Sequence, residues 1–247
     1  MRWLCFLLAG SAAAQTVPAK PLRFDLTAIP ETRDSFVYRI GGREAGYVVY
    51  QYEIVSRETG QEIVFTEEVR LGTAFRERSR VVMDRLTGEP VASFQRLEFG
   101  NPASDTAAVE HDLDVKRSAI EGRRRVERRS GDVRIIPVSG KLPRGAVWSR
   151  YGFIAAAVTN ALPGDSLTIN AFDELGDSLR TLTLVAEPPV TLELPAGRFD
   201  VLPLRVSGGR VYVTRAAPRR IVKLEVLGQP LVSELVASGP VIRSPAR

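Results

Sequence analysis

Few residues in this chain could do chemistry, and the single histidine is the first to consider. His111 lies between Glu110 and Asp112, in a segment where apolar and polar residues alternate from Val109 to Val115. Serine-protease-like catalysis needs a histidine beside a nucleophile, and histidine-based metal sites normally use two or more imidazoles. Because His111 lies on the apolar side of its segment, we expect it to be a core residue.

The same region carries dense charge of both signs. Acidic residues at alternate positions resemble a weak divalent-cation site, and the arginines that follow resemble an anion-binding patch: Glu110, Asp112 and Asp114, then Arg123, Arg124, Arg125, Arg128 and Arg129. If a turn centres near Ala119, Asp114 faces Arg124 and Glu110 faces Arg128. Such opposed pairs contribute roughly 0.2–1 kcal/mol each. We therefore predict a salt-bridge ladder and no metal site, and we keep Arg124 and Arg128 as a candidate anion patch.

Familiar catalytic and cofactor-binding motifs do not occur in the sequence. It contains no G-x-S-x-G, no G-x-x-x-x-G-K-[ST] and no G-x-G-x-x-G, and Cys5 is its single cysteine. Paired carboxylates are different, because they need only be close in space. We expect a non-catalytic protein without cofactor, and we keep a carboxylate-based hydrolase as the weaker alternative.

The N-terminal segment indicates export. Residues 1–14 have the pattern of a signal peptide: Met1-Arg2, the apolar stretch Trp3–Ala9, and small residues at Ala12–Ala14. Removal of this segment also removes the cysteine, so no disulfide is expected. No later apolar run approaches the ~18 residues of a membrane span. We expect an exported protein of the periplasm or cell envelope, soluble after cleavage, with no transmembrane segment and no nucleic-acid partner.

The rest of the chain reads as strands separated by turns. Ile221–Leu227 alternates, with Val222, Leu224 and Val226 on one side, and Gly41-Gly42 is typical of a two-residue turn. In Glu62–Leu71 one side is apolar: Ile63, Phe65, Val69 and Leu71. Further strands are expected over 199–206 and 211–214.

These patterns predict one all-β domain over residues 36–236. We expect a single large curved antiparallel sheet (a meander, half-barrel or clamshell-like form) with one helix near 151–162, where apolar residues recur at helical spacing. Ser149 is a candidate N-cap, and Pro163-Gly164 would end the helix. Residues 15–35 form a proline-containing leader, and residues 237–247 a disordered tail.

Turn and strand motifs also carry a resemblance to a known family. Tyr38–Gly42 with Ala45-Gly46, Pro195–Phe199, Pro218–Val222 and Ser233–Val236 occur in the order typical of that family, as do the shorter motifs Leu142-Pro143 and Pro163–Asp165. The chain thus resembles a family of exported bacterial β-sheet proteins that is catalogued only as a domain of unknown function. The resemblance implies a cell-envelope protein built on a large curved sheet, and it supplies no catalytic residues.

A large curved sheet either fills its concave face with side chains or leaves a cleft for a ligand. Four amphipathic aromatic residues could line such a face and bind a lipid or other amphipathic ligand: Tyr50, Tyr52, Trp148 and Tyr151. The alternative is a structural or protein-interaction module that uses the arginine-rich hairpin or a sheet edge on an anionic envelope component. The less regular middle, Glu110–Tyr151, is where we expect any site.

Overall fold

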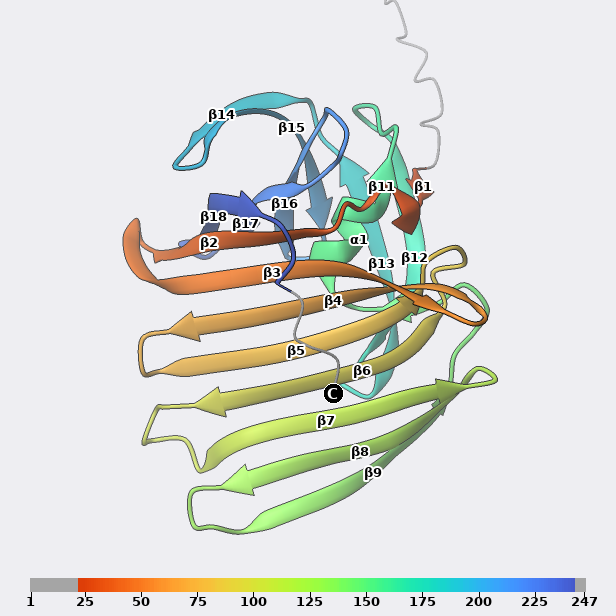
Figure 1. The fold of residues 1–247 in the computed structure, drawn as a ribbon. Helices are drawn as coiled ribbons and strands as arrows, with labels where there is room; N and C mark the ends of the chain where they lie inside the picture. Colours follow the sequence, from red (N-terminus) through yellow and green to blue (C-terminus); the bar gives the residue numbers. More distant parts are fainter. Residues whose placement is uncertain (1–21, 243–247) are drawn as a thin grey trace, which may run out of the picture.

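One open, strongly curved β-sheet forms most of the protein, as Figure 1 shows. The structure is a computed structural model, and it describes residues 22–242. The main sheet has 16 strands in the order β10-β12-β13-β15-β16-β17-β18-β2-β3-β4-β5-β6-β7-β8-β9, with β14 paired to β15, and it does not close. The predicted all-β fold with a large curved antiparallel sheet is confirmed.

The elements have the following bounds: β1 Arg23–Phe24, η1 Leu26–Ala28, β2 Thr32–Ile40, β3 Arg43–Arg57, β4 Gly60–Leu71, β5 Phe75–Asp84, β6 Pro90–Phe99, β7 Thr106–Lys116, β8 Ala119–Arg128, β9 Val133–Lys141, β10 Val147–Trp148, α1 Tyr151–Ala157, β11 Val158–Thr159, β12 Ser166–Asp173, β13 Ser178–Ala186, β14 Val190–Leu194, β15 Gly197–Val206, β16 Gly209–Thr214, β17 Ile221–Val226 and β18 Leu231–Gly239.

Local sequence explains the meander from β2 to β9. Gly41 and Gly42 both take positive φ, +57° and +78°, and join β2 to β3 in the predicted two-residue turn. The strands predicted toward the C-terminus are also present as β15, β16 and β17. In β17 the predicted alternation holds from Lys223 onward, since Leu224 packs against the core and Lys223 pairs with Glu225 on the other face. At the start of the strand Ile221 and Val222 are both buried, because the register with β16 shifts there.

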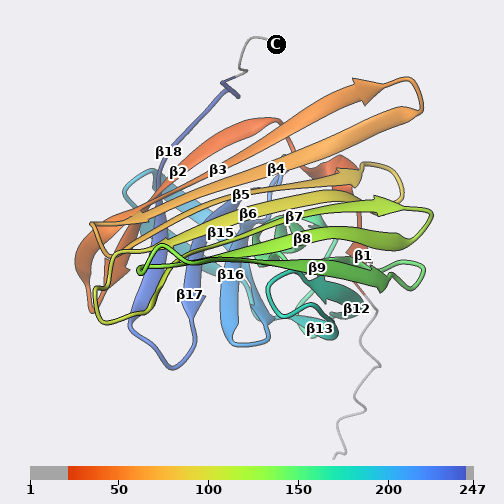
Figure 2. The same cartoon turned by 90° about the horizontal axis from the view of Figure 1, so that it is seen from below.

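The sheet curls over its own concave face, where α1 also packs (Figures 1 and 2). Phe153 of α1 lies 6.1 Å from Phe65 of β4, ring centre to ring centre, while other contacts join α1 to β16 and β17. At the edge strand β10, the indole nitrogen of Trp148 donates a hydrogen bond to the carbonyl of Val82 in β5 at 3.2 Å. The two arms of the sheet therefore share one apolar core.

The predicted helix is present but shorter than expected. It ends at Ala157 because the next two residues, Val158 and Thr159, leave the helix and pair with β1 as strand β11. The N-cap prediction is wrong: Arg150 holds that position, without a side-chain capping bond. The hydroxyl of Ser149 donates instead to a carboxylate of Glu174.

The pairing predicted for the β7–β8 hairpin is also wrong. The turn is a tight two-residue one at Arg117 and Ser118, both with positive φ (52° and 65°), so it lies before Ala119 rather than around it. As a result Asp114 faces Glu121, and Glu110 faces Arg125.

The folded region extends beyond the expected bounds at both ends. Part of the expected leader forms β1, η1 and the start of β2, and β18 runs on to Gly239. The expected signal peptide, residues 1–14, lies outside the described residues, as does the end of the expected tail. Within residues 22–242, no helix has the length and apolar character needed to cross a membrane.

Candidate functional site

A row of polar side chains crosses the concave face from β2 to β8. Each member lies opposite the next across a strand boundary: Asp34, Tyr50, Glu67, Ser79, Gln95, His111 and Arg124. We call this set the polar row. The next row of side chains across the same strands is mostly apolar. It includes Tyr52, Phe65 and Val81, which lie opposite one another. Antiparallel register alone therefore aligns polar groups from distant segments into one belt inside the curved sheet.

Arg150, just before α1, lies over this belt and contacts two carboxylates with one nitrogen. Its Nη1 is 2.8 Å from Oε1 of Glu77 and 3.5 Å from Oε2 of Glu67. The three side chains are only 16%, 12% and 15% exposed for Arg150, Glu77 and Glu67. Gln95 also donates to Oε1 of Glu77, at 2.6 Å. A guanidinium thus bridges two adjacent, largely buried carboxylates.

A third carboxylate, Glu174, completes this group from the β12–β13 loop. It is buried, and its side chain accepts hydrogen bonds from Ser149 at 2.9 Å and from Ser93 at 3.4 Å. Its backbone carbonyl accepts from Arg124 at 3.2 Å. We call Glu67, Glu77, Glu174 and Arg150 the Arg150 cluster.

Burial governs the protonation of this cluster. It raises the pKa of Glu67 from 4.5 to about 7, an effect that the Glu77 charge strengthens and Arg150 opposes. Burial likewise raises the pKa of Glu174, again opposed by Arg150. The pKa of Glu67 therefore lies close to neutral pH.

His111 is a buried, neutral imidazole, as expected for a core histidine. Its Nε2 lies 3.1 Å from the hydroxyl of Ser93, and burial, aided by Arg150 and Arg124, lowers its pKa from 6.5 to about 3. Within residues 22–242 its Nδ1 has no hydrogen-bond partner. Since Glu174 contacts the serine rather than the second ring nitrogen, these three residues do not form the relay of a catalytic triad.

A pocket of about 260 Å³ opens beside the Arg150 cluster. Its walls combine charged groups with apolar surface: Tyr50, Phe65, Glu67, Gln95, Ser149, Arg150, Gly152, Asp173, Glu174, Leu175, Arg180 and Leu224. Arg180, which forms an ion pair with Asp173, is 57% exposed and Leu175 is 41% exposed, so these residues mark the mouth. We call this the polar pocket.

A second pocket of about 280 Å³ adjoins it on the same concave face. Its side-chain lining comes mainly from β15–β18 and β2: Tyr38, Val206, Val211, Leu224, Val226, Leu231 and Ser233. Register places these residues on one side of the sheet. Leu224 lines both pockets. We call the second one the apolar pocket.

No family model, no curated protein and no solved structure matches this chain. The resemblance carried by the turn motifs therefore stays an expectation.

The predicted aromatic residues occupy different environments. Tyr50 lines the polar pocket, whereas Tyr52 and Trp148 are 3% and 0% exposed within the core. Tyr151 is the first residue of α1, and its side chain lies outside the described part of the structure. Of the four, Tyr50 is brought to a cavity.

The two arginines of the candidate anion patch do not lie together in one patch. Arg124 belongs to the polar row and donates to Glu174, whereas Arg128 is exposed and forms a 3.5 Å ion pair with Asp105. Of the acidic residues in the same hairpin, Glu110 forms an ion pair, but its partner is Arg96 of β6 at 3.1 Å and not an arginine of the opposing strand as predicted. No group of three potential metal ligands was found in residues 22–242.

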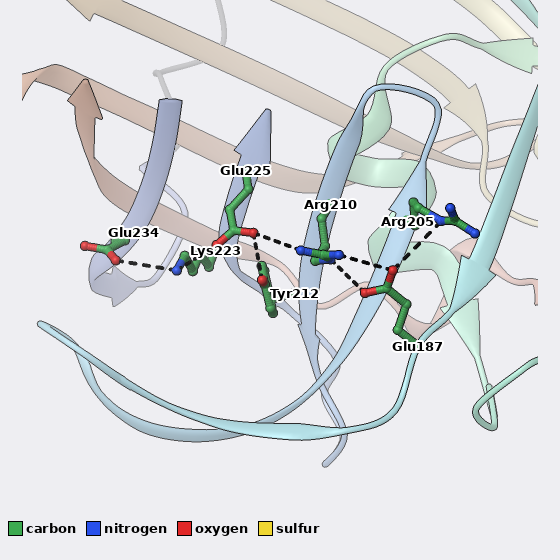
Figure 3. Close-up of polar contacts among 7 residues, drawn as sticks. All are labelled: Glu187, Arg205, Arg210, Tyr212, Lys223, Glu225 and Glu234. Carbon is green, nitrogen blue, oxygen red and sulfur yellow. Dashed lines mark hydrogen bonds and ion pairs between the residues drawn. The ribbon is translucent and has the colours of Figure 1, made fainter. Parts of the chain in front are cut away.

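The opposite face of β15–β18 carries a charge ladder that neutralises itself (Figure 3). Arg210 contacts Glu187 at 2.7 Å and Glu225 at 3.4 Å, and Lys223 contacts Glu225 at 2.9 Å. Tyr212 donates to Glu225 at 2.8 Å, and its pKa rises to about 12 through burial and this bond. With every charge paired, the ladder holds strands together behind the apolar pocket.

Sequence reasoning missed the Arg150 cluster, although one signal was present. Glu67 interrupts the otherwise apolar side of β4, between Phe65 and Val69. A lone acid on a buried side needs a partner. Arg150 lies within the expected region, Glu110–Tyr151, but Glu67, Glu77 and Glu174 lie outside it.

Proposed function

We propose that this protein binds a small amphipathic ligand on the concave face of its sheet and does not transform it chemically. The observation that carries this proposal is the pair of adjoining pockets at Leu224. A polar head group would bind beside the Arg150 cluster, and an apolar chain would lie against Val206, Val211 and Leu231. The two environments match the two halves of such a ligand.

The size of the pockets supports a ligand that occupies both. Volumes of about 260 and 280 Å³ each fall just below the ~300–1,000 Å³ that is usual for small-molecule sites, and together they fall within it. Burial of an alkyl chain in the apolar pocket would contribute roughly 25 cal/mol per Å². Affinity would then come mainly from the chain, and orientation from the head group.

A carboxylate-based hydrolase is the second candidate, and one observation favours it. The carboxylates of Glu67 and Glu77 both contact Nη1 of Arg150. Glu67 has a pKa of about 7 and lines an open pocket. Such a group suits general acid catalysis. However, Glu77 is held by both Arg150 and Gln95, so it lacks the freedom of a nucleophile or base.

The site of action we propose is the periplasm or cell envelope, where a carrier of amphipathic molecules has a role. The support comes from the apolar stretch Trp3–Ala9 and the small residues after it. An anionic envelope partner, our other alternative, has weaker support because Arg124 and Arg128 have separate partners.

Native mass spectrometry of the purified protein tests the binding proposal. We expect the purified protein to carry a bound molecule with the mass of a lipid, which organic solvent should extract. We also expect saturable binding of added single-chain amphiphiles. Leu224→Gln places an amide where the pockets meet and should weaken this binding about tenfold or more. The matched control is Leu86→Gln, at a side chain that is 86% exposed in the β5–β6 turn. Protein that neither carries nor takes up an amphiphile would refute the proposal.

A further inference from the structure

The main sheet has one covered end and one open end. The covered end is β10, only two residues long, whose Val147 and Trp148 are buried, with Trp148 bonded to β5. The open end is β9, nine residues long, which has β8 as its single neighbour within residues 22–242. Figure 1 shows β9 as the lowest strand of the sheet. The side of β9 that faces away from β8 is therefore an unpaired strand edge.

The register of β8 and β9 shows which backbone groups lie on this edge. The two strands pair without a shift, and just beyond one end the amide of Leu142 donates to the carbonyl of Ser118 at 2.8 Å. At the other end the amide of Arg128 donates to the carbonyl of Asp132, also at 2.8 Å. Bonded positions alternate in an antiparallel pair with positions that point away, so the odd-numbered residues of β9 face outward. These are Val133, Ile135, Pro137, Ser139 and Lys141, of which Pro137 alone lacks an N–H.

The side chains of β9 add apolar surface and positive charge to the edge. Val138 is buried in the core, so the odd-numbered side chains lie on the outer face of the sheet, where Val133 is 48% exposed and Ile135 62%. Arg134 and Lys141 are also exposed. Across β8, Arg134 faces Val126 and Lys141 faces Ala119, so neither has a carboxylate opposite it. The strand itself contains no acidic residue.

The positive charge of the whole chain is concentrated at this end. Residues 119–141, which form β8 and β9, carry seven basic and three acidic residues, a net charge of +4 against +5 for the chain. A second copy would bring the same charge against the edge, and like charges together with a proline are known to oppose such pairing. An acidic partner would instead neutralise it.

We propose that β9 is a docking edge for an extended acidic segment of a partner protein, which adds one antiparallel strand to the open end of the sheet. Main-chain hydrogen bonds to the outward groups would hold the segment. Apolar side chains of the segment would contact Val133 and Ile135, and carboxylates would face Arg134 and Lys141. Neither pocket takes part, so this interaction is independent of the proposed function.

Fluorescence anisotropy with a nine-residue peptide, labelled at its N-terminus, tests the proposal. The probe is Glu-Ser-Thr-Thr-Val-Thr-Val-Glu-Val-amide, whose two glutamates would face Lys141 and Arg134 in an antiparallel pair. Matched probes carry Gln or Lys in place of both glutamates. We expect the Glu probe to bind about tenfold more tightly than the Gln probe, and the Lys probe to bind least. Equal binding of the three probes, or no binding of the Glu probe, would overturn the proposal.

Hydrogen exchange followed by NMR separates strand pairing from general attraction between charges. With the Glu probe at about ten times its dissociation constant, the outward amides of Val133, Ile135, Ser139 and Lys141 should exchange about tenfold more slowly. Amides that already bond to β8 should change less. Binding without added protection of the outward amides would show that no strand is added, and the proposal would fail.

Substitutions on both partners assign the binding to this edge. Ile135→Pro removes an outward N–H without breaking a bond to β8, and it should weaken binding of the Glu probe about fivefold or more. A probe that is N-methylated at the valine opposite Ile135 tests the same pairing with the unaltered protein and should be weakened similarly. Full affinity in both experiments would contradict the proposed pairing.

A charge substitution tests the role of Arg134. Arg134→Gln should lower the ratio of Glu-probe to Gln-probe affinity about threefold to fivefold. Arg43→Gln makes the same charge change at an exposed site beside the β2–β3 turn and should leave the ratio unchanged. An equal fall in both variants would show that the peptide senses only the overall charge. Circular dichroism checks that each variant is folded.

Sedimentation velocity of the protein without peptide tests the competing occupant of the edge. We expect a monomer, because two copies of β9 repel each other. A dimer that Ile135→Pro dissociates would show that a second copy occupies the edge, and it would overturn the proposal.

Discussion

Arg150 and Glu77 form an ion pair of 2.8 Å inside the curved sheet, although 73 positions separate them in the chain. Glu77 comes from the middle of the sheet, and Arg150 from the connection that leads from β10 to α1. The pair fixes this connection over the polar row. Glu67, the next carboxylate, lies 3.5 Å from the same nitrogen and lines the polar pocket.

Loss of Arg150 should destabilise the fold strongly. Arg150→Met leaves Glu67, Glu77 and Glu174 without their shared cation, and removal of one partner from a buried ion pair typically costs about 3–5 kcal/mol. Urea denaturation would measure the loss in free energy of unfolding. Arg150→Met combined with Glu77→Gln should recover part of it. A change below about 1 kcal/mol in the single variant would show that the cluster contributes little.

Glu67 should make stability fall as the pH rises from about 4.5 to about 7. Its pKa is higher in the folded protein than its ordinary value of 4.5, so folding favours the protonated form and this contribution is lost as the pH passes about 7. Burial is the largest cause of this raised pKa, the Glu77 charge adds to it, and Arg150 together with hydrogen bonds from Tyr50 and Ser79 opposes it.

Glu67→Gln should remove that part of the pH dependence. Urea denaturation from pH 5 to pH 8 would give the free energy of unfolding at each pH. This free energy should fall less steeply with pH in the variant, and the two slopes should differ by up to about 1.4 kcal/mol per pH unit. Glu68→Gln provides the control on the outer face of β4. Parallel profiles for Glu67→Gln and the wild type would contradict the expectation.

The single histidine permits a direct test by NMR. His111 should show no titration of its ring signals between pH 5 and pH 8 in the folded protein, because its pKa is lowered to about 3. In urea the same signals should titrate near 6.5. Neutral His111 therefore stabilises the fold above pH 6.5, and this contribution is lost as the pH falls toward 3. A folded-state midpoint near 6.5 would show that the ring is accessible to solvent.

The β7–β8 turn should accept a stabilising substitution. Arg117 and Ser118 have φ of 52° and 65°, a region where asparagine and glycine are favoured. Replacement of Arg117-Ser118 by Asn-Gly should raise the free energy of unfolding by about 0.5–1 kcal/mol. Arg117→Lys keeps both the charge and the unfavourable φ, so it should have no such effect. Equal stabilities for all three proteins would show that the turn carries no strain.

Local structure follows from patterns of neighbouring residues in the sequence. Alternation in Ile221–Leu227, the Gly41-Gly42 turn and the apolar spacing after Tyr151 predicted a curved all-β sheet with one helix, because such patterns depend on neighbouring residues. The same patterns identified His111 as a core residue.

The site, by contrast, was decided by tertiary structure. Which residues face each other across the sheet depends on the register of every hairpin, and a shift of a few positions at Arg117-Ser118 changed all the pairs predicted for β7 and β8. The sequence does not show whether Ser149 caps the helix or binds Glu174, because this depends on where the β12–β13 loop lies. The sheet curls over itself, so the segment that follows edge strand β10 lies against the strands at the centre of the sheet. This contact forms the Arg150 cluster. No local pattern encodes that closure, since it arises from the summed twist and packing of the whole sheet.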